Sequence, residues 1–144
     1  MPTSRKPEKL VVDANPILSA LLGGKAKRLF LEAGITEFAI PESILREIHR
    51  YIPRMAEKIG VSPEFVSYAL DLLPLTVYVS KRYRGSMKAA TLQIAQRDPG
   101  DIEVLALALA LERPLWTNDH DFEGTTIRTF TTAELLAICF PKTS

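Results

Sequence analysis

Short apolar runs alternate with segments of helical periodicity along this chain of 144 residues. The apolar runs are residues 10–12, 37–40, 75–79, 114–117 and 126–130. A short apolar run bounded by polar residues is typical of a buried strand in a parallel sheet. Strands that alternate with helices form a mostly parallel sheet covered on both faces. The alternation therefore predicts one α/β domain over residues 1–144, an α/β/α sandwich of about five strands, with residues 1–8 as a flexible N-terminal tail.

Helix start and stop signals fill the intervals between these strands. Asn15 is a suitable N-cap for a helix with Pro16 in its first turn, which would stop at the glycines of residues 23–24. Pro53 predicts a break between two helices, because proline interrupts helical hydrogen bonding. Further helices are expected at residues 25–33, 41–51, 54–59, 63–73, 87–95 and 102–112, with a last helix capped by Thr131 and running to residue 138.

Four acidic residues adjoin this pattern. Asp13 directly follows the first strand and Asp119 closely follows the fourth, so both should lie at the carboxyl edge of the sheet, where ligand sites form. Asp101 opens a helix that travels roughly 16 Å, and the strand after it returns roughly 13 Å. Asp119 should therefore arrive close to Asp101. Glu47 lies more than one turn into its helix, one residue from a core position, and could point inward.

Carboxylates gathered without compensating bases repel one another. The natural partner for such a group is a hard divalent cation, which prefers oxygen ligands. The four acids therefore indicate metal-dependent phosphate chemistry.

The first two acids also have structural interpretations. Asp13 could instead cap the helix that begins near Pro16. Glu47 could form a solvated ion pair with Arg46 or Arg50.

The later acids have structural interpretations too. Asp98 is a good N-cap because Pro99 would occupy the first helical position, and Asp101 would then be the third helical residue. Asp119 and Asp121 lie in a sequence typical of turns. Capping explains Asp98 and Asp101 locally, but it does not explain why Asp101 should converge with acids from other segments.

Composition limits the partners and the cellular compartment that we expect for this chain. The net charge is +1, from 18 Lys+Arg and 17 Asp+Glu, so nucleic-acid binding would need local clusters of bases. The lone Cys139 cannot form an intramolecular disulfide and fits a reducing cytoplasm as a buried thiol.

The apolar stretches do not match a secretory or membrane segment. Asp13 interrupts the first apolar stretch, whereas a secretory signal needs an uninterrupted one. The later apolar run 104–111 is far shorter than the roughly 20 residues of a membrane span. We expect a soluble cytoplasmic protein that does not insert in a membrane.

Four segments carry a family resemblance: Val11-Val12-Asp13-Ala14-Asn15, residues 43–48, residues 98–110, and Leu115-Trp116-Thr117-Asn118-Asp119-His120-Asp121-Phe122. In order, spacing and total length they resemble the PIN-domain proteins, particularly the small toxin ribonucleases of VapC type. The resemblance implies that Asp13, Glu47, Asp101 and Asp119 are the catalytic residues and ligate one or two Mg²⁺ or Mn²⁺ ions. It implies supporting roles for Asn15, Thr117 and Asn118, and it leaves Asp98 and Asp121 as competing ligands.

The activity that this resemblance implies is hydrolysis of RNA phosphodiester bonds by a metal-activated water. The protein would be the toxin of a type II toxin–antitoxin pair, with an antitoxin protein as partner and a homodimer as its assembly. The bases that would contact RNA phosphates are Lys81, Arg82, Arg84, Lys88 and Arg97, although a solvated loop would explain the same stretch.

Two other classes of protein remain as alternatives. A non-catalytic PIN module would bind RNA or protein without cleaving either. An aspartyl-phosphate enzyme or receiver domain also places acids at strand ends, but a phosphatase of that type would have a second aspartate where this chain has Asn15. His49 and His120 belong to no histidine metal motif and are expected to be polar surface residues.

Overall fold

The computed structural model describes residues 5–94 and 98–142. Its centre is a five-stranded sheet with the strand order β3-β2-β1-β4-β5, in which each neighbouring pair is parallel. The strands are β1 Lys9–Val12, β2 Glu37–Pro41, β3 Leu75–Tyr78, β4 Leu115–Trp116 and β5 Thr129–Phe130. The predicted parallel α/β architecture is confirmed, although β5 is shorter than the expected strand.

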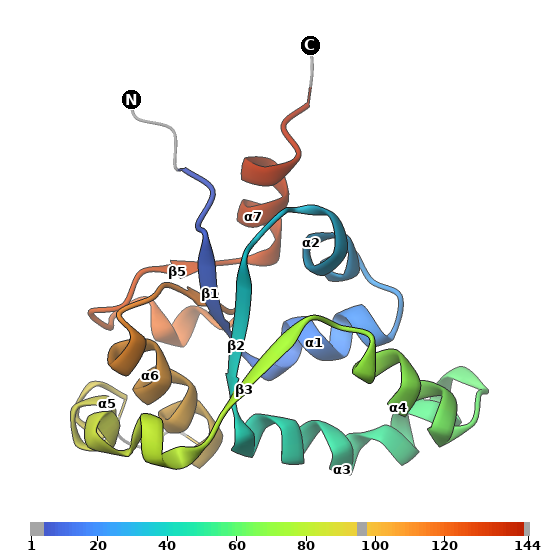
Figure 1. Cartoon of the computed structure of the whole chain (residues 1–144), viewed down its shortest axis with the longest axis horizontal. Coiled ribbons are helices and arrows are strands. Elements are labelled where there is room, and N and C mark those ends of the chain that lie inside the picture. Colours follow the sequence, from blue (N-terminus) through green and yellow to red (C-terminus); the bar gives the residue numbers. More distant parts are fainter. Residues whose placement is uncertain (1–4, 95–97, 143–144) are drawn as a thin grey trace.

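Helices cover both faces of the sheet. In Figure 1, α5 and α6 lie on one side of β1 and β2, and α1 and α2 lie on the other, while α7 packs against α2. The helices are α1 Ala14–Leu21, α2 Ala26–Glu32, α3 Glu42–Ile59, α4 Pro63–Asp71, α5 Met87–Gln93, α6 Pro99–Leu111 and α7 Thr132–Cys139. Three short 3₁₀ turns complete the described elements: η1 Ser80–Arg82, η2 Arg84–Ser86 and η3 His120–Phe122.

The core has the central strand and α6 at its middle. Leu10, Val11 and Val12 are fully buried in β1, as are the five consecutive residues 104–108 in α6. A helix that is apolar on every side must be enclosed on every side, and α6 is held between the sheet, α5 and η2. None of the described helices is long and apolar enough to cross a membrane.

Trp116 packs on the face of the sheet that α2 covers. Its ring lies 4.8 Å from that of Phe30 on α2 and 6.0 Å from that of Phe38 on β2, measured between centroids. Its indole Nε1 donates a hydrogen bond of 3.0 Å to Thr132 Oγ1. A single buried aromatic residue therefore fixes α2 on the sheet and sets where α7 begins.

The break expected at Pro53 is wrong. α3 continues through this residue to Ile59 and ends at Gly60, whose φ of 77° lies in the left-handed region. Pro53 is exposed, whereas Ile48 and Ile52 are buried on the opposite side of the helix. The carbonyl that loses its intrahelical donor can be hydrated, and burial of the apolar face on both sides of the proline keeps the helix continuous.

Replacing Pro53 with alanine should therefore raise the free energy of unfolding by about 1–3 kcal/mol. An interior proline costs a helix about 3 kcal/mol, and part of that gain is offset because alanine makes the unfolded chain less restricted. Urea unfolding monitored by circular dichroism measures the change. Arg54→Ala, at an exposed neighbouring position, is the control and should shift stability by no more than about 0.5 kcal/mol. An unchanged or lowered stability of Pro53→Ala would contradict this account of α3.

Candidate functional site at the acidic edge of the sheet

Asp13 lies where β1 ends and α1 begins. Its side chain is 8% exposed, and it is the N-cap of α1. Oδ1 accepts a hydrogen bond of 2.9 Å from the Ala14 backbone N–H, and Oδ2 accepts one of 2.8 Å from Thr117 Oγ1. The expectation that Asn15 caps this helix is wrong, because the helix begins one residue after Asp13, whose backbone is extended. A carboxylate has about four acceptor positions, so this capping role does not preclude binding a cation.

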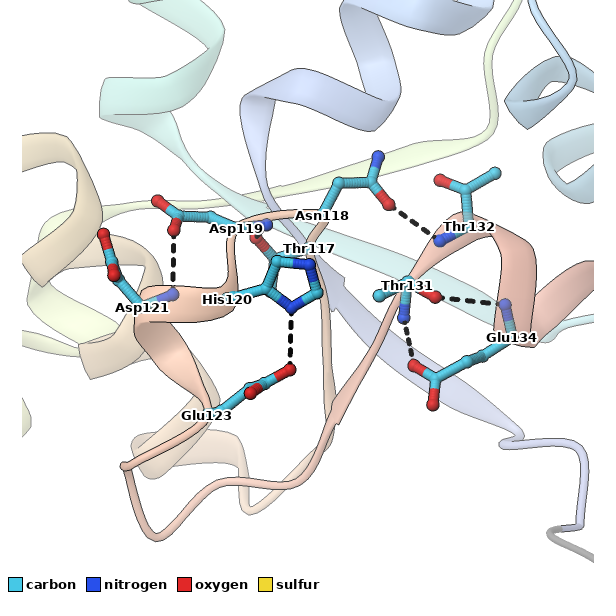
Figure 2. A network of polar contacts seen from close by, with 9 residues as sticks. All are labelled: Thr117, Asn118, Asp119, His120, Asp121, Glu123, Thr131, Thr132 and Glu134. Atoms are coloured by element: carbon cyan, nitrogen blue, oxygen red, sulfur yellow. Dashed lines mark hydrogen bonds and ion pairs between the residues drawn. The ribbon is translucent and has the colours of Figure 1, made fainter.

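Thr117 joins the ends of β1 and β4. It is 2% exposed, and its hydroxyl both donates to Asp13 and accepts 3.1 Å from the Asp119 backbone N–H. Asp119 in turn caps η3, since its Oδ1 accepts 2.9 Å from the Asp121 backbone N–H (Figure 2). The turn interpretation of Asp119 is therefore confirmed. The same hydrogen bonds connect that turn to Asp13.

Asn118 fastens this loop to two helices. Its Nδ2 donates 3.0 Å to Asn15 Oδ1 on α1. Figure 2 shows the second contact, in which its Oδ1 accepts 2.8 Å from the Thr132 backbone N–H at the start of α7. Thr131 completes a reciprocal capping box with Glu134 there, as the predicted cap required. Sequence reasoning missed Thr132, although its place immediately after the last strand and its cap put it at the same edge of the sheet.

Glu47 lies more than one turn into α3 and is half-buried. Its Oε1 would be 3.8 Å from a Cβ added at Gly100, so the carboxylate lies close to the first turn of α6. Burial, followed by the negative charges of Asp98, Asp13 and Asp101, raises the pKa of Glu47. Glu47 therefore shares one electrostatic environment with acids that come from β1 and from α6.

The pairing of Glu47 with a neighbouring base is only partly supported. The positive charge of Arg50 opposes the rise in the Glu47 pKa, but its effect is smaller than those of burial and the acids. Arg46, the other predicted partner, instead forms an ion pair of 3.9 Å with Glu42, one turn earlier in α3.

Asp98 and Asp101 both belong to the start of α6. Asp98 is the N-cap and its Oδ1 accepts a weak hydrogen bond of 3.4 Å from the Gly100 backbone N–H, with Pro99 at the first helical position as expected. Asp101 lies in the first turn and is half-buried. Since both charges act on Glu47, the structure leaves the choice between Asp98 and Asp101 open.

The chemistry of this edge matches a hard cation, because its donors are carboxylate, amide and hydroxyl oxygens. Within residues 5–94 and 98–142, however, no three Asp, Glu, His or Cys side chains are arranged so that they could hold a metal ion as they stand. A bound cation would therefore have to draw the carboxylates inward. His49 and His120 are both exposed, and a hydrogen bond with Glu123 raises the pKa of His120.

The basic segment after β3 is anchored next to the acids. Tyr83 is 1% exposed and its Oη donates 2.9 Å to Glu103 Oε1, two residues beyond Asp101. Burial and this carboxylate raise the pKa of Tyr83 to about 12, so the hydroxyl remains a donor. The bases on either side of Tyr83 are exposed, as is a further one on α5: Lys81, Arg82, Arg84 and Lys88. Arg97, the remaining predicted base, lies outside the described residues.

Comparisons with known proteins agree with this architecture. A model of the PIN domain family matches residues 11–138. No curated protein sequence matches the chain. The crystal structure of VapBC2 from Rickettsia felis bound to a DNA fragment from their promoter aligns with a TM-score of 0.64 and 18% identity, over 85% of this chain and 98% of that one. A toxin–antitoxin complex from Klebsiella pneumoniae aligns with a TM-score of 0.63 and 23% identity, over 85% of this chain and 97% of the other. At such identities the two structures establish a shared fold.

Removing the Thr117 hydroxyl should destabilise the protein. Thr117→Ala removes the buried hydroxyl that donates to Asp13 Oδ2 and accepts from the Asp119 backbone N–H, which should lower the free energy of unfolding by about 1–3 kcal/mol. Thr117→Ser retains the hydroxyl and should lose less. Urea unfolding of the three proteins provides the comparison, and equal losses in both variants would show that packing of the methyl group is the dominant contribution.

The raised pKa of Glu47 predicts a particular pH dependence for the metal-free protein. Below pH 4.5, the ordinary value, the side chain is protonated in both the folded and the unfolded states. At higher pH the unfolded chain releases the proton first, so stability falls until the folded protein also releases it. Glu47→Gln should therefore have a higher Tm than the native chain at neutral pH in chelator, and the two should converge in acid.

The matched control for this experiment is Glu57→Gln, an exposed position on the same helix, which should not show this pH-dependent difference. A lower Tm for Glu47→Gln at neutral pH would mean that the Glu47 carboxylate is stabilised by a base instead of being strained by acids.

Proposed function

Since this chain belongs to the PIN domain family, we propose that it is a divalent-metal-dependent endoribonuclease and the toxin of a type II toxin–antitoxin pair. The observation that carries the proposal is the environment of Glu47, whose pKa is raised by burial and then by the negative charges of Asp98, Asp13 and Asp101. Acids placed close enough to oppose one another's ionisation are costly without a cation. Their position at the carboxyl edge of a parallel sheet is where α/β proteins bind ligands.

The ligands for the cation are proposed to be Asp13, Glu47, Asp101 and Asp119, with Asp98 and Asp121 beside them. When bound, one or two Mg²⁺ or Mn²⁺ ions would polarise the phosphoryl oxygen, lower the pKa of water and stabilise the leaving oxygen.

The surrounding residues hold this set in position. Thr117 orients Asp13 and fixes the Asp119 backbone, while Asn118 and Asn15 hold the loop against α1. A carboxylate oxygen left unliganded would orient the attacking water.

The RNA would be held by bases close to this edge. Lys81, Arg82 and Arg84 are exposed on the segment that Tyr83 anchors to α6, and Lys88 follows on α5. Such contacts to phosphates give affinity without sequence preference, which decreases as salt increases. Arg97 is proposed to join them.

An antitoxin is proposed as the protein partner, because the two structurally similar assemblies are described as VapBC2 and as a toxin–antitoxin complex. An open groove of about 730 Å³ between α2 and α7 has an apolar floor that includes Leu136 and Phe140, with Lys25, Arg28 and Lys142 at its rim. It would fit an amphipathic segment that carries acidic residues.

A homodimer is proposed as the assembly. Phe65 and Tyr68 on α4 and Leu72 at its C-cap are 59–64% exposed and recur at helical spacing, which makes an apolar stripe suited to a second copy.

A cytoplasmic setting is also proposed. Cys139 is half-buried, less enclosed than expected from the sequence. This burial raises the pKa of Cys139 and so makes the thiol a poor nucleophile, and a single inert thiol fits a reducing compartment.

Cleavage of a panel of structured RNAs by the native chain, Asp13→Asn and Asp101→Asn tests the nuclease. We expect cleavage with Mg²⁺ or Mn²⁺, none in chelator, and a loss of more than about 100-fold in each variant, since loss of metal chemistry removes several kcal/mol of transition-state stabilisation. Asparagine is as good an N-cap as aspartate, so Asp13→Asn changes the ligand while preserving the cap. Asp71→Asn, exposed at the end of α4, is the control and should cleave normally. Undiminished cleavage in both site variants would refute the proposed site.

A non-catalytic PIN module remains the second candidate function. It is favoured by one observation, the lack of a ready-made group of three metal ligands among residues 5–94 and 98–142. Titration with Mg²⁺ and Mn²⁺ separates the two, because such a module would bind RNA and show no metal-dependent cleavage of any RNA in the panel.

A further inference from the structure

A second pocket, of about 330 Å³, lies at the opposite end of the sheet. Its lining residues are Arg5, Lys6, Pro7, Glu8, Lys9, Pro114, Arg128 and Phe130. Lys9 begins β1 and Asp13 follows its end, so the pocket is separated from the acidic edge by a strand of roughly 13 Å. The pocket combines the segment before β1, the residue before β4, and the edge strand β5.

The pocket is strongly basic. Four of the lining side chains, Arg5, Lys6, Lys9 and Arg128, carry positive charge, and Glu8 carries the one negative charge among them. Lys6 Nζ donates 2.8 Å to the Ala33 carbonyl and is thereby held at the end of α2. All four basic side chains are exposed, so a polyanion can reach them from solvent.

The acid on the adjacent strand is shared between Lys9 and a base outside the pocket. Glu37 is the register partner of Lys9, but its carboxylate already pairs with Arg113 and accepts 2.8 Å from Tyr78 Oη. Taken together, the pocket lining, Glu37 and Arg113 contain five basic and two acidic side chains. The charge is therefore opposite in sign to that of the catalytic edge.

The walls of the pocket are suited to a nucleotide base. Pro7, Pro114 and Phe130 supply apolar surface, and the Arg128 guanidinium lies 4.6 Å from the centroid of the Phe130 ring. A guanidinium plane held in this way is a surface on which bases stack. The volume is at the lower end of the range for small-ligand sites, which fits one nucleotide better than a folded peptide element.

We propose that this pocket is a second RNA contact, in which Arg5, Lys9 and Arg128 bind backbone phosphate and the apolar wall receives a base. It rests on the proposed function for the choice of RNA over other nucleic acids. β5 links the pocket to the acidic edge: Arg128 directly precedes this strand, and Thr132, whose backbone N–H donates to Asn118 Oδ1, lies two residues after it. The acids repel phosphate when no cation is bound, so the basic end would supply affinity that the catalytic edge lacks.

Binding of a fluorescein-labelled single-stranded oligouridylate, followed by fluorescence anisotropy in EDTA, tests the proposal. Lys9→Gln/Arg128→Gln should weaken binding about tenfold or more at low salt. It should also reduce the salt slope by about 1.4, since each phosphate contact to a single strand contributes about 0.7. Chelator prevents metal-dependent cleavage, so the binding result stands even if the native chain proves not to be a nuclease.

Two further variants control for charge and folding. Lys27→Gln/Lys58→Gln removes the same charge from exposed positions that do not line the pocket and should bind as the native chain does. Lys9→Arg/Arg128→Lys keeps the charge in the pocket and should retain the native salt slope. A single-stranded DNA of matching sequence distinguishes phosphate contacts from 2′-hydroxyl contacts. If the pocket variant loses affinity for both nucleic acids equally, the contact is with the backbone phosphate; if it loses affinity for RNA alone, the contact includes the 2′-hydroxyl.

Equal oligouridylate affinity in the native chain and in Lys9→Gln/Arg128→Gln would overturn the proposal. So would a weakening that the Lys27→Gln/Lys58→Gln control reproduces. If the pocket variant instead loses binding to a labelled oligoglutamate peptide and keeps its affinity for RNA, the pocket receives an acidic protein segment, and the RNA assignment is wrong.

Discussion

Carboxylates from separate segments gather at one edge of the sheet, where their negative charges repel one another. Backbone N–H groups partly offset this repulsion. Asp13 accepts a hydrogen bond from the N–H that opens α1, Asp98 accepts one from the first turn of α6, and Asp119 accepts one from the turn η3. An N-cap stabilises negative charge through these N–H groups and through the helix dipole. Capping and metal binding are therefore compatible roles. The caps bring several helix and turn N-termini to the same edge, and the raised pKa of Glu47 shows that the acids still act on one another.

The rest of the fold supports the loop at that edge and places basic side chains at the opposite end of the sheet. Trp116 is buried among aromatic rings and hydrogen-bonded to Thr132, which in turn binds Asn118 through its backbone. A short polar chain thus connects the core to the loop that carries Asp119. Basic side chains gather at the other end, around Lys9 and Arg128, where the strands begin. The net charge of +1 is a sum over the whole chain and therefore does not reveal this separation.

Much of this could be predicted from the sequence, for physical reasons that also explain what could not. Alternation of strands and helices fixes a parallel sheet, and a parallel sheet places Asp13 and Asp119 at one edge. Local signals failed where tertiary packing decides: α3 continues through Pro53 because its buried face extends on both sides. Asp13 and Asn15, two residues apart, could each cap α1, and only the backbone shows that Asp13 does so. The basic pocket was not foreseen, since it joins short segments before β1, β4 and β5 that carry no common motif.

X-ray diffraction from crystals soaked in Mn²⁺ tests whether these acids hold a divalent cation. We expect an anomalous difference peak at the carboxyl edge, bound by Asp13 and by at least one acid from the start of α6, with Glu47 drawn towards it. Soaked crystals that show no peak at these carboxylates, or a peak only elsewhere on the protein, would contradict it. The acids would then be caps and turn residues alone.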